Sequence, residues 1–213
     1  MSTPFIRRYS VQESCNLFMA NLQKHALHRI PECVSKAILS KMTVEYFKKG
    51  ALFCSQGDAH TRAGMLLNGA GKAFSIDENN QKSIIKFICS GEMIFDEHAE
   101  DGGVSDKFIE FVCTSGVLVI NDLPQLTEIF IQENLFPDIL HVYMGFYKEE
   151  LHNIQCISQI RNIQDAKMRI SEFYKKFPGM DKYFSGGDIA ALIGLSRETF
   201  SRYRHDVLKA NHD

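Results

Sequence analysis

The sequence predicts an α+β protein: an antiparallel β roll preceded by short helices, then a long helix, then a small helical domain. Between residues 47 and 120, short apolar runs are separated at regular intervals by glycine and other turn residues, which is typical of a small antiparallel roll or barrel. Residues 137–161 contain no proline after Pro137 and no glycine after Gly145. They carry apolar residues at helical spacing. The segment FPGMDKYFSGGD, residues 177–188, then separates the last two predicted helices from the rest.

Length and composition predict a globular protein with two domains. The chain has 213 residues, of which 45% are hydrophobic and 23% charged, and it has no low-complexity segment. The formal net charge is −2, but residues 161–213 hold ten lysines and arginines against seven acidic residues, and residues 1–160 hold 14 against 19. An acidic N-terminal part and a basic C-terminal part fit a sensor domain joined to a domain that binds a polyanion.

The N-terminal sequence and the cysteines indicate a cytoplasmic protein that does not enter a membrane. MSTPFIRRYSVQESC lacks the apolar run of a signal peptide, and no segment reaches the roughly 18–20 apolar residues of a membrane span. The cysteines are scattered without a C-x-x-C pair, so we expect free thiols in a reducing compartment and no metal site. The six are Cys15, Cys33, Cys54, Cys89, Cys113 and Cys156.

The first elements are expected to be short helices between residues 12 and 46, with a break at Pro31. FKKGALFCSQGD, residues 47–58, then places Gly50 and Gly57 around a short strand, and MLLNGAGKAFSI, residues 65–76, predicts two more strands. DENN, residues 77–80, is a turn before SIIKFI, and SGE, residues 90–92, is another turn. KFIEFVCTSGVLVI, residues 107–120, completes the roll.

The long helix over residues 137–161 admits two interpretations. Its apolar residues, which recur in steps of three and four, could pack against the helix's own domain, or they could pair with a second copy of the chain as in a partial coiled coil. These residues are Ile139, Tyr143, Phe146, Leu151, Ile154 and Ile157.

The C-terminal sequence predicts a helix-turn-helix. Asp188 is placed to cap a helix that starts at Ile189, Gly194 can end it in a left-handed conformation, and Ser196 can cap the next helix. A helix-turn-helix needs small residues at the crossing and apolar anchors on the second helix. The crossing and turn positions hold Ala190, Gly194 and Leu195, and the anchors are Ile189, Ile193, Phe200 and Tyr203.

The exposed face of the second of these helices predicts contacts with DNA. Arginine can donate to both major-groove acceptors of guanine, and glutamate can accept from the amino group of cytosine. The expected base contacts are Arg197, Glu198, Ser201 and Arg202, with His205 on the same face. The expected phosphate contacts are Ser196, Thr199, Arg204 and Lys209. The alternative is a surface helical hairpin with a solvated, charged face.

Together these segments resemble the Crp/Fnr family of bacterial transcription regulators over nearly the whole chain. KKGALFCSQGD and LLNGAGKAF resemble the glycine spacing of the cyclic-nucleotide-binding β roll, and SRETFSR resembles the recognition helix of cyclic-AMP-responsive members. AKMRISEFYKKFPGM, residues 166–180, resembles the short branch of the family found in Bacteroidetes. The resemblance implies that Arg197, Glu198 and Arg202 recognise a TGTGA-type half-site.

The resemblance also implies an organisation and partners. A sensor domain would occupy residues 1–136, a dimerisation helix residues 137–161, and a DNA-binding domain residues 162–213. A homodimer would bind double-stranded DNA at a palindromic operator and would contact RNA polymerase. Only KANHD follows Leu208, so the phosphate contacts of the family's β-hairpin wing are expected to be missing, as in the short branch.

The effector pocket departs from that of the cyclic-AMP-binding members. Their phosphate-binding segment runs from Gly-Glu to Arg-Ser, and Gly91 and Glu92 match its start. The position expected to hold the arginine falls near Ser105, which is followed by Asp106, so a cyclic phosphate would meet a carboxylate and no guanidinium. We therefore expect no useful affinity for cyclic AMP, and Glu92 is either a turn residue or a ligand contact.

No cofactor is predicted. The separation of Cys15 and Cys33 does not resemble the cysteine cluster of iron–sulfur sensors in the family, and no spacing of histidine and cysteine supports haem. The chain is not expected to be an enzyme, because it shows no Ser/His/Asp set, Walker loop or His-x-x-x-His pair. The alternative to a transcription regulator is a small-molecule sensor or protein-interaction module without sequence-specific DNA binding; the effector, if there is one, is not identified.

Overall fold

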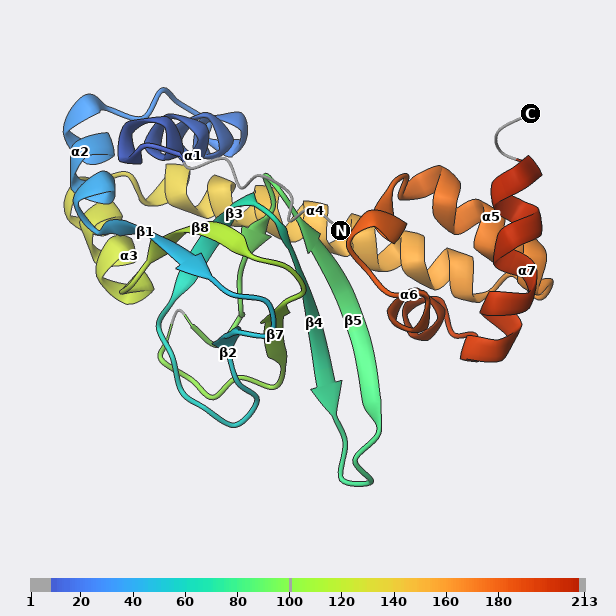
Figure 1. Ribbon diagram of the computed structural model, residues 1–213. Helices are drawn as coiled ribbons and strands as arrows, with labels where there is room; N and C mark the ends of the chain where they lie inside the picture. Colours follow the sequence, from blue (N-terminus) through green and yellow to red (C-terminus); the bar gives the residue numbers. More distant parts are fainter. Residues whose placement is uncertain (1–8, 100, 211–213) are drawn as a thin grey trace. The chain divides into compact units, whose positions relative to one another are not determined.

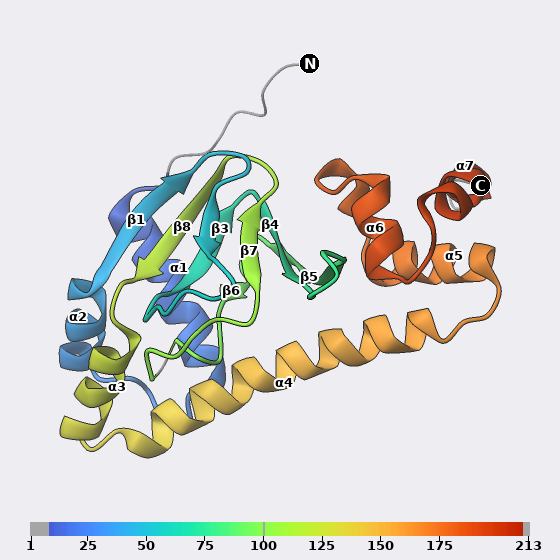
Figure 2. The same cartoon turned by 90° about the horizontal axis from the view of Figure 1, so that it is seen from below.

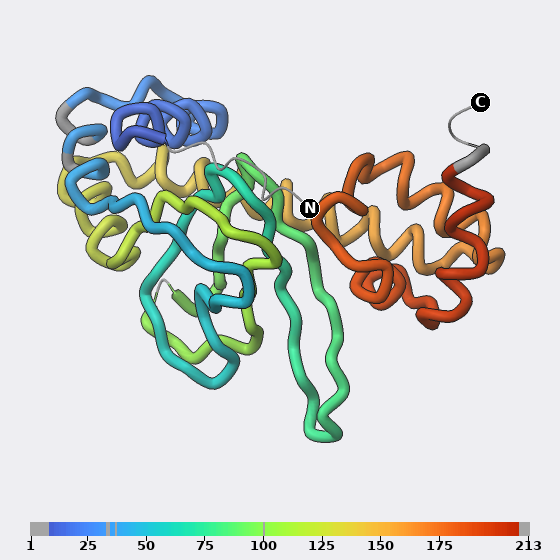
Figure 3. Tube along the Cα trace, viewed as in Figure 1, coloured from blue at the N-terminus to red at the C-terminus, as the bar shows by residue number. Residues whose placement is uncertain are grey.

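A computed structural model describes residues 9–99 and 101–210, except for the side chains of residues 33, 34, 37, 209 and 210 (Figures 1 and 3). Its helices are α1 (Val11–His25), α2 (Glu32–Ser40), α3 (Leu123–Gln132), α4 (Phe136–Arg161), α5 (Ala166–Lys176), the 3₁₀ turn η1 (Met180–Lys182), α6 (Gly186–Leu192) and α7 (Arg197–Ala210). Its strands are β1 (Met42–Phe47), β2 (Leu52–Cys54), β3 (Ala63–Asn68), β4 (Ala70–Ile76), β5 (Lys82–Cys89), β6 (Met93–Ile94), β7 (Phe108–Phe111) and β8 (Ser115–Ile120).

The chain divides into two compact units that are not contiguous in sequence. The first comprises Met1–Ala73 and Phe87–Lys148, and the second comprises Phe74–Lys86 and Glu149–Asp213. The second unit therefore combines the tip of the β4–β5 hairpin with the C-terminal helices. No described helix has both the length and the low polarity that crossing a membrane requires.

The β roll consists of two four-stranded sheets, ordered β1-β8-β3-β6 and β2-β7-β4-β5. β8 pairs antiparallel with both β1 and β3, so that Ile120 lies opposite Met42 on one side and Ala63 on the other. Figure 2 shows these three strands side by side. Every residue of β8 is buried, which explains why residues 117–120 are a continuous apolar run and do not alternate.

Helices close the core of the first unit. Phe18 and Leu22 of α1 and Phe130 of α3 join Leu118 and Ile120 of β8 in one buried cluster. The side-chain carboxylate of Asp122 accepts from the amide of Gln125, and Pro124 lies in the first turn of α3.

The helical prediction for residues 12–46 is wrong in its last part. α1 and α2 are helices, with Pro31 at the N-cap of α2, but Met42–Phe47 is strand β1. Its β-branched and aromatic residues fit a strand, and full-length pairing with β8 overrides the helical spacing of the apolar residues before it.

Candidate functional site

The first helix of the helix-turn-helix begins earlier than the sequence suggested. Ser185 is the N-cap of α6: its Oγ accepts from the amide of Asp188 over 3.1 Å and donates to the carboxylate of Asp188 over 2.7 Å. The prediction that Asp188 caps a helix starting at Ile189 is therefore wrong. Gly186 and Gly187 enter the first turn, and Asp188 supports the cap from the third helical position.

The turn between α6 and α7 has the expected backbone. Gly194 has φ +70°, the left-handed region that glycine adopts without steric cost. The amide of Leu195 donates to the carbonyl oxygen of Ala190 over 2.8 Å and so closes the C-terminus of α6. The predicted role of Gly194 in ending the helix is confirmed.

Two arginines that sequence reasoning did not single out hold the C-terminus of α6. Nε of Arg161 donates to the carbonyl oxygen of Leu192 over 2.7 Å. Nη1 of Arg169 donates to the carbonyl oxygen of Gly194 over 3.0 Å, and its Nε donates to that of Ile163 over 2.8 Å. These bonds satisfy carbonyl groups that a helix end leaves without intrahelical partners. Two of the basic residues in this unit therefore stabilise the turn.

α7 has one buried face and one exposed face. Ser196 caps the helix, because its Oγ accepts from the amide of Thr199 over 3.1 Å. Phe200 and Val207 are buried, and Tyr203 is half-buried. Arg197, Glu198, Ser201, Arg202 and His205 are all exposed, as the sequence predicts. Within the described residues, neither Arg197 nor Arg202 takes part in an ion pair.

Glu198 is held in its charged form. Hydrogen bonds to its carboxylate, first from its own amide and then from Ser196, lower its pKa below the ordinary value for glutamate. A charged carboxylate can only accept hydrogen bonds, so Glu198 can accept from the amino group of a base such as cytosine.

Some of the residues expected to contact phosphate form hydrogen bonds or ion pairs within the protein. Arg204 is half-buried: its Nε donates to the hydroxyl of Tyr174 over 3.2 Å, and its Nη2 lies 3.5 Å from Asp181. Thr199 shares a hydrogen bond of 3.0 Å with the capping hydroxyl of Ser196. The side chain of Lys209 lies outside the described residues. Contacts of these four residues with DNA remain predictions.

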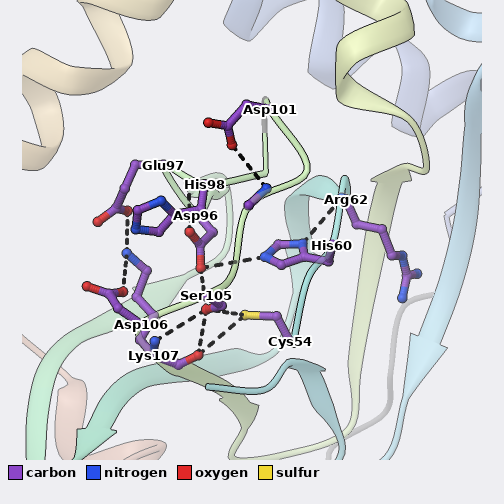
Figure 4. A network of polar contacts seen from close by, with 11 residues as sticks. Cys54, His60, Arg62, Asp96, Glu97, His98, Asp101, Ser105, Asp106 and Lys107 are labelled. Carbon is purple, nitrogen blue, oxygen red and sulfur yellow. Dashed lines mark hydrogen bonds and ion pairs between the residues drawn. The ribbon is translucent and has the colours of Figure 1, made fainter. Parts of the chain in front are cut away.

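A polar network lies in the first unit, around the segment expected to hold an effector (Figure 4). Ser105 is buried, and its Oγ donates to Oδ2 of Asp96 over 2.5 Å. Asp96 is also buried and accepts from the amide of His98 over 2.9 Å. Burial alone would raise the pKa of the Asp96 carboxyl, but the hydrogen bonds from Ser105 and His98 hold it below its ordinary value.

Charged groups extend the network on one side. The ammonium group of Lys107 forms an ion pair with Glu97 and lies 3.6 Å from Asp106. Figure 4 shows the Arg62 side chain directed away from Asp96, and its guanidinium donates to Glu45 over 2.7 Å. Among the residues labelled in Figure 4, the cation that pairs with the carboxylates around Ser105 is therefore Lys107, because the guanidinium of Arg62 pairs with Glu45.

Gly91 and Glu92 form a turn next to β6. Gly91 has φ +91°, and its amide donates to the carbonyl oxygen of Leu66 over 2.7 Å. A carboxylate oxygen of Glu92 accepts from the amide of Cys89 over 2.8 Å, which fits the turn role considered for this residue. A ligand role for Gly91, Glu92 or Ser105 stays a prediction.

The cysteines with described side chains are free thiols, as expected. Burial raises the pKa of Cys54 to about 11 and that of Cys89 to about 12, so both are protonated at neutral pH. Cys33 lies outside the described side chains.

The sequence matches no protein-family model and no curated protein, but its fold matches solved structures. A transcriptional regulator of the CRP/FNR family from Thermus thermophilus aligns with a TM-score of 0.55 at 18% identity, over 79% of this chain and 87% of that one. The chain has the Crp/Fnr fold. FixK2 from Bradyrhizobium japonicum aligns with a TM-score of 0.64 at 15% identity, over 80% of this chain and 86% of FixK2.

Another neighbour with the Crp/Fnr fold responds to a cyclic dinucleotide. CLP of Xanthomonas campestris, described as a c-di-GMP-responsive global regulator, aligns with a TM-score of 0.63 at 16% identity, over 85% of this chain and 93% of CLP. The predicted fold class, an α+β protein with a β roll, a long helix and a C-terminal helix-turn-helix, is therefore confirmed.

Proposed function

We propose that this protein is a homodimeric, sequence-specific DNA-binding transcription regulator of the Crp/Fnr type. The exposed face of α7 carries the proposal. Arg197, Glu198 and Arg202 are exposed there, while Phe200 and Val207 anchor the opposite face. Two arginines that form no ion pair with another described residue can donate to guanine, and a charged glutamate can accept from cytosine. The fold neighbours that are transcription regulators support this assignment.

An exposed apolar stripe on α4 supports the dimer. Five apolar side chains, 39% to 56% exposed, recur along this helix at alternating steps of four and three residues. This is the spacing of the a and d positions of a coiled coil, which becomes buried when two helices pair. The stripe consists of Leu140, Met144, Tyr147, Leu151 and Ile154. The sequence-based stripe mixed two faces, because Ile139 and Ile157 are buried within the chain.

A dimer of this kind implies a palindromic operator. Two copies of α7 about 34 Å apart would enter successive major grooves on one side of the duplex, with half-site centres about 10 bp apart. RNA polymerase is the expected protein partner of the bound dimer.

The pocket of the β roll is proposed not to use cyclic AMP. The position at which the cyclic-AMP-binding members carry an arginine falls near Ser105, whose hydroxyl donates to Asp96. A cyclic phosphate there would approach the buried carboxylate of Asp96 without a charge-assisted bond from arginine. Calorimetry with cyclic AMP should show no binding in the low micromolar range.

A selection from randomised duplex DNA tests the function directly. The full chain is used without added ligand at about 150 mM salt, where simple phosphate attraction is weakened. We expect a two-fold symmetric motif with guanine at positions that face Arg197 and Arg202. Recovery of no motif, together with stabilisation by small molecules, would instead favour the alternative of a sensor or interaction module without DNA specificity.

A further inference from the structure

Three potential metal ligands meet inside the β roll. Cys54 ends β2, His60 lies between β2 and β3, and Asp96 follows β6, and Figure 4 shows all three side chains directed toward one another. Their ligand atoms all lie within 4.8 Å of one another. Cys54 and Asp96 are buried, and the His60 side chain is only 10% exposed.

The His60 side chain gives an independent indication of a ligand. Its Nε2 is buried and makes no hydrogen bond within the described residues. It lies 3.5 Å from Oδ2 of Asp96, beyond the range of about 2.7–3.2 Å for an N–H···O bond. Two bonds of about 2.0–2.1 Å to one tetrahedral metal ion would place nitrogen and oxygen about 3.3 Å apart. The observed spacing is longer than an ordinary direct hydrogen bond and close to the spacing of two ligands on one metal ion.

We propose that Cys54, His60 and Asp96 bind one zinc ion. Sulfur, imidazole nitrogen and carboxylate oxygen together match the ligand preferences of zinc, whereas magnesium and calcium prefer oxygen ligands alone. Three protein ligands leave a fourth tetrahedral position for water or an exogenous ligand. The proposal departs from the expectation of no metal site, which rested on the spacing of cysteines and histidines along the sequence.

Neighbouring groups already orient two of the ligands. Ser105 donates to Oδ2 of Asp96, and the amide of His98 donates to Oδ1, so this carboxylate is fixed without the metal. The Oγ of Ser105 also lies 3.8 Å from Sγ of Cys54 and so links the two ligands. In known metal sites, neighbouring groups that hydrogen-bond to the metal-binding side chains hold those side chains in place.

Binding requires two proton changes. Zinc binds thiolate, so the thiol proton of Cys54 passes to solvent buffer when the Zn–S bond forms. Binding through Nε2 also requires the imidazole proton of His60 on Nδ1, which now accepts from the amide of Arg62 over 3.3 Å. That long hydrogen bond would be given up in exchange for the metal bond.

Cobalt(II) titration of the metal-free full chain, with thiols kept reduced by a phosphine, tests the proposal. We expect a thiolate-to-cobalt charge-transfer band that saturates at one equivalent and disappears when zinc(II) is added. Cys54→Ser should abolish the band, and His60→Gln should weaken cobalt affinity by about tenfold or more. Zinc should also raise the melting temperature of the native chain, and this rise should be lost in His60→Gln.

Two control variants test whether the metal binds at Cys54, His60 and Asp96 and not at neighbouring groups. Glu97, His98 and Asp106 form a second, more exposed group of possible ligands without sulfur, and Cys89 is a half-buried thiol elsewhere in the roll. His98→Gln and Cys89→Ser should both retain the band and the zinc-induced stabilisation. A native chain without the band, or a band lost in Cys89→Ser and kept in Cys54→Ser, would overturn the proposal. None of these readouts depends on DNA binding.

Discussion

Nε of Arg161, the last residue of α4, donates to the carbonyl oxygen of Leu192, the last residue of α6, over 2.7 Å. A second donor of the same guanidinium, Nη2, reaches the carbonyl oxygen of Ile84 in the β4–β5 hairpin over 3.3 Å. One side chain therefore joins three segments of the second unit. It is one of the donors that hold the C-terminus of α6, the first helix of the helix-turn-helix.

Arg161→Ala should lower the free energy of unfolding by about 1 kcal/mol, because the carbonyl group of Leu192 loses its charged donor. Denaturant unfolding of the full chain measures this change. Lys167→Ala removes an exposed cation of α5 and serves as the control. Equal stability of the two variants would show that the hydrogen bond contributes nothing to the unit.

Gly194→Ala should destabilise the chain by about 1 kcal/mol, since an L-residue is strained at φ +70°. Steric space is not the cause, because the nearest atom to an added Cβ is Cγ of Arg161 at 3.7 Å. The matched control is Gly187→Ala in the first turn of α6, where added contacts are ordinary and φ is not in the left-handed region. Thermal unfolding should show a lower melting temperature for the first variant alone.

Arg202→Ala should cost about 1–3 kcal/mol of binding to the selected operator and relax preference at one base pair. Titration of labelled duplexes, specific and random, measures both effects. Lys175→Ala removes an exposed cation from α5, which carries none of the proposed base contacts, and should leave the preference intact. A loss from Arg202→Ala that is equal on specific and random DNA would indicate a phosphate contact instead of a base contact.

Leu151→Glu should weaken the dimer, because it places a charge at the most exposed position of the apolar stripe on α4. Sedimentation at several concentrations should show a shift toward monomer, accompanied by weaker binding to the full operator. Gln155→Glu adds the same charge at an exposed position outside the stripe and should leave the association unchanged. A monomeric native chain would remove the basis of the palindromic operator.

The features that the sequence predicted correctly are those encoded locally. The left-handed Gly194, the cap by Ser196 and the buried Phe200 follow from residue type and spacing within a short segment. The choice between Ser185 and Asp188 as the cap of α6 could not be made in this way, because both are good capping residues three positions apart. Only the surrounding structure decides which of them precedes the helix.

The Cys54, His60 and Asp96 cluster has no comparable local signal. Its three members come from segments that the strand pairings of the roll bring together, such as the isolated bridge between Ala59 and Val104. Motif searches that rely on fixed ligand spacing therefore miss it. The capping arginines of α6 were missed for the same reason, since their acceptors lie far along the chain.

The discontinuity of the second unit affects how the chain folds during synthesis. Lys86 pairs with Glu150 over 2.6 Å, so a segment made early contacts one that leaves the ribosome more than sixty residues later. At a synthesis rate of about 5–20 residues per second, the tip of the hairpin is made several seconds before the helices that it contacts. A C-terminal fragment that starts at residue 149 would lack this tip altogether, and expression of the helix-turn-helix alone should yield a less stable product than the full chain.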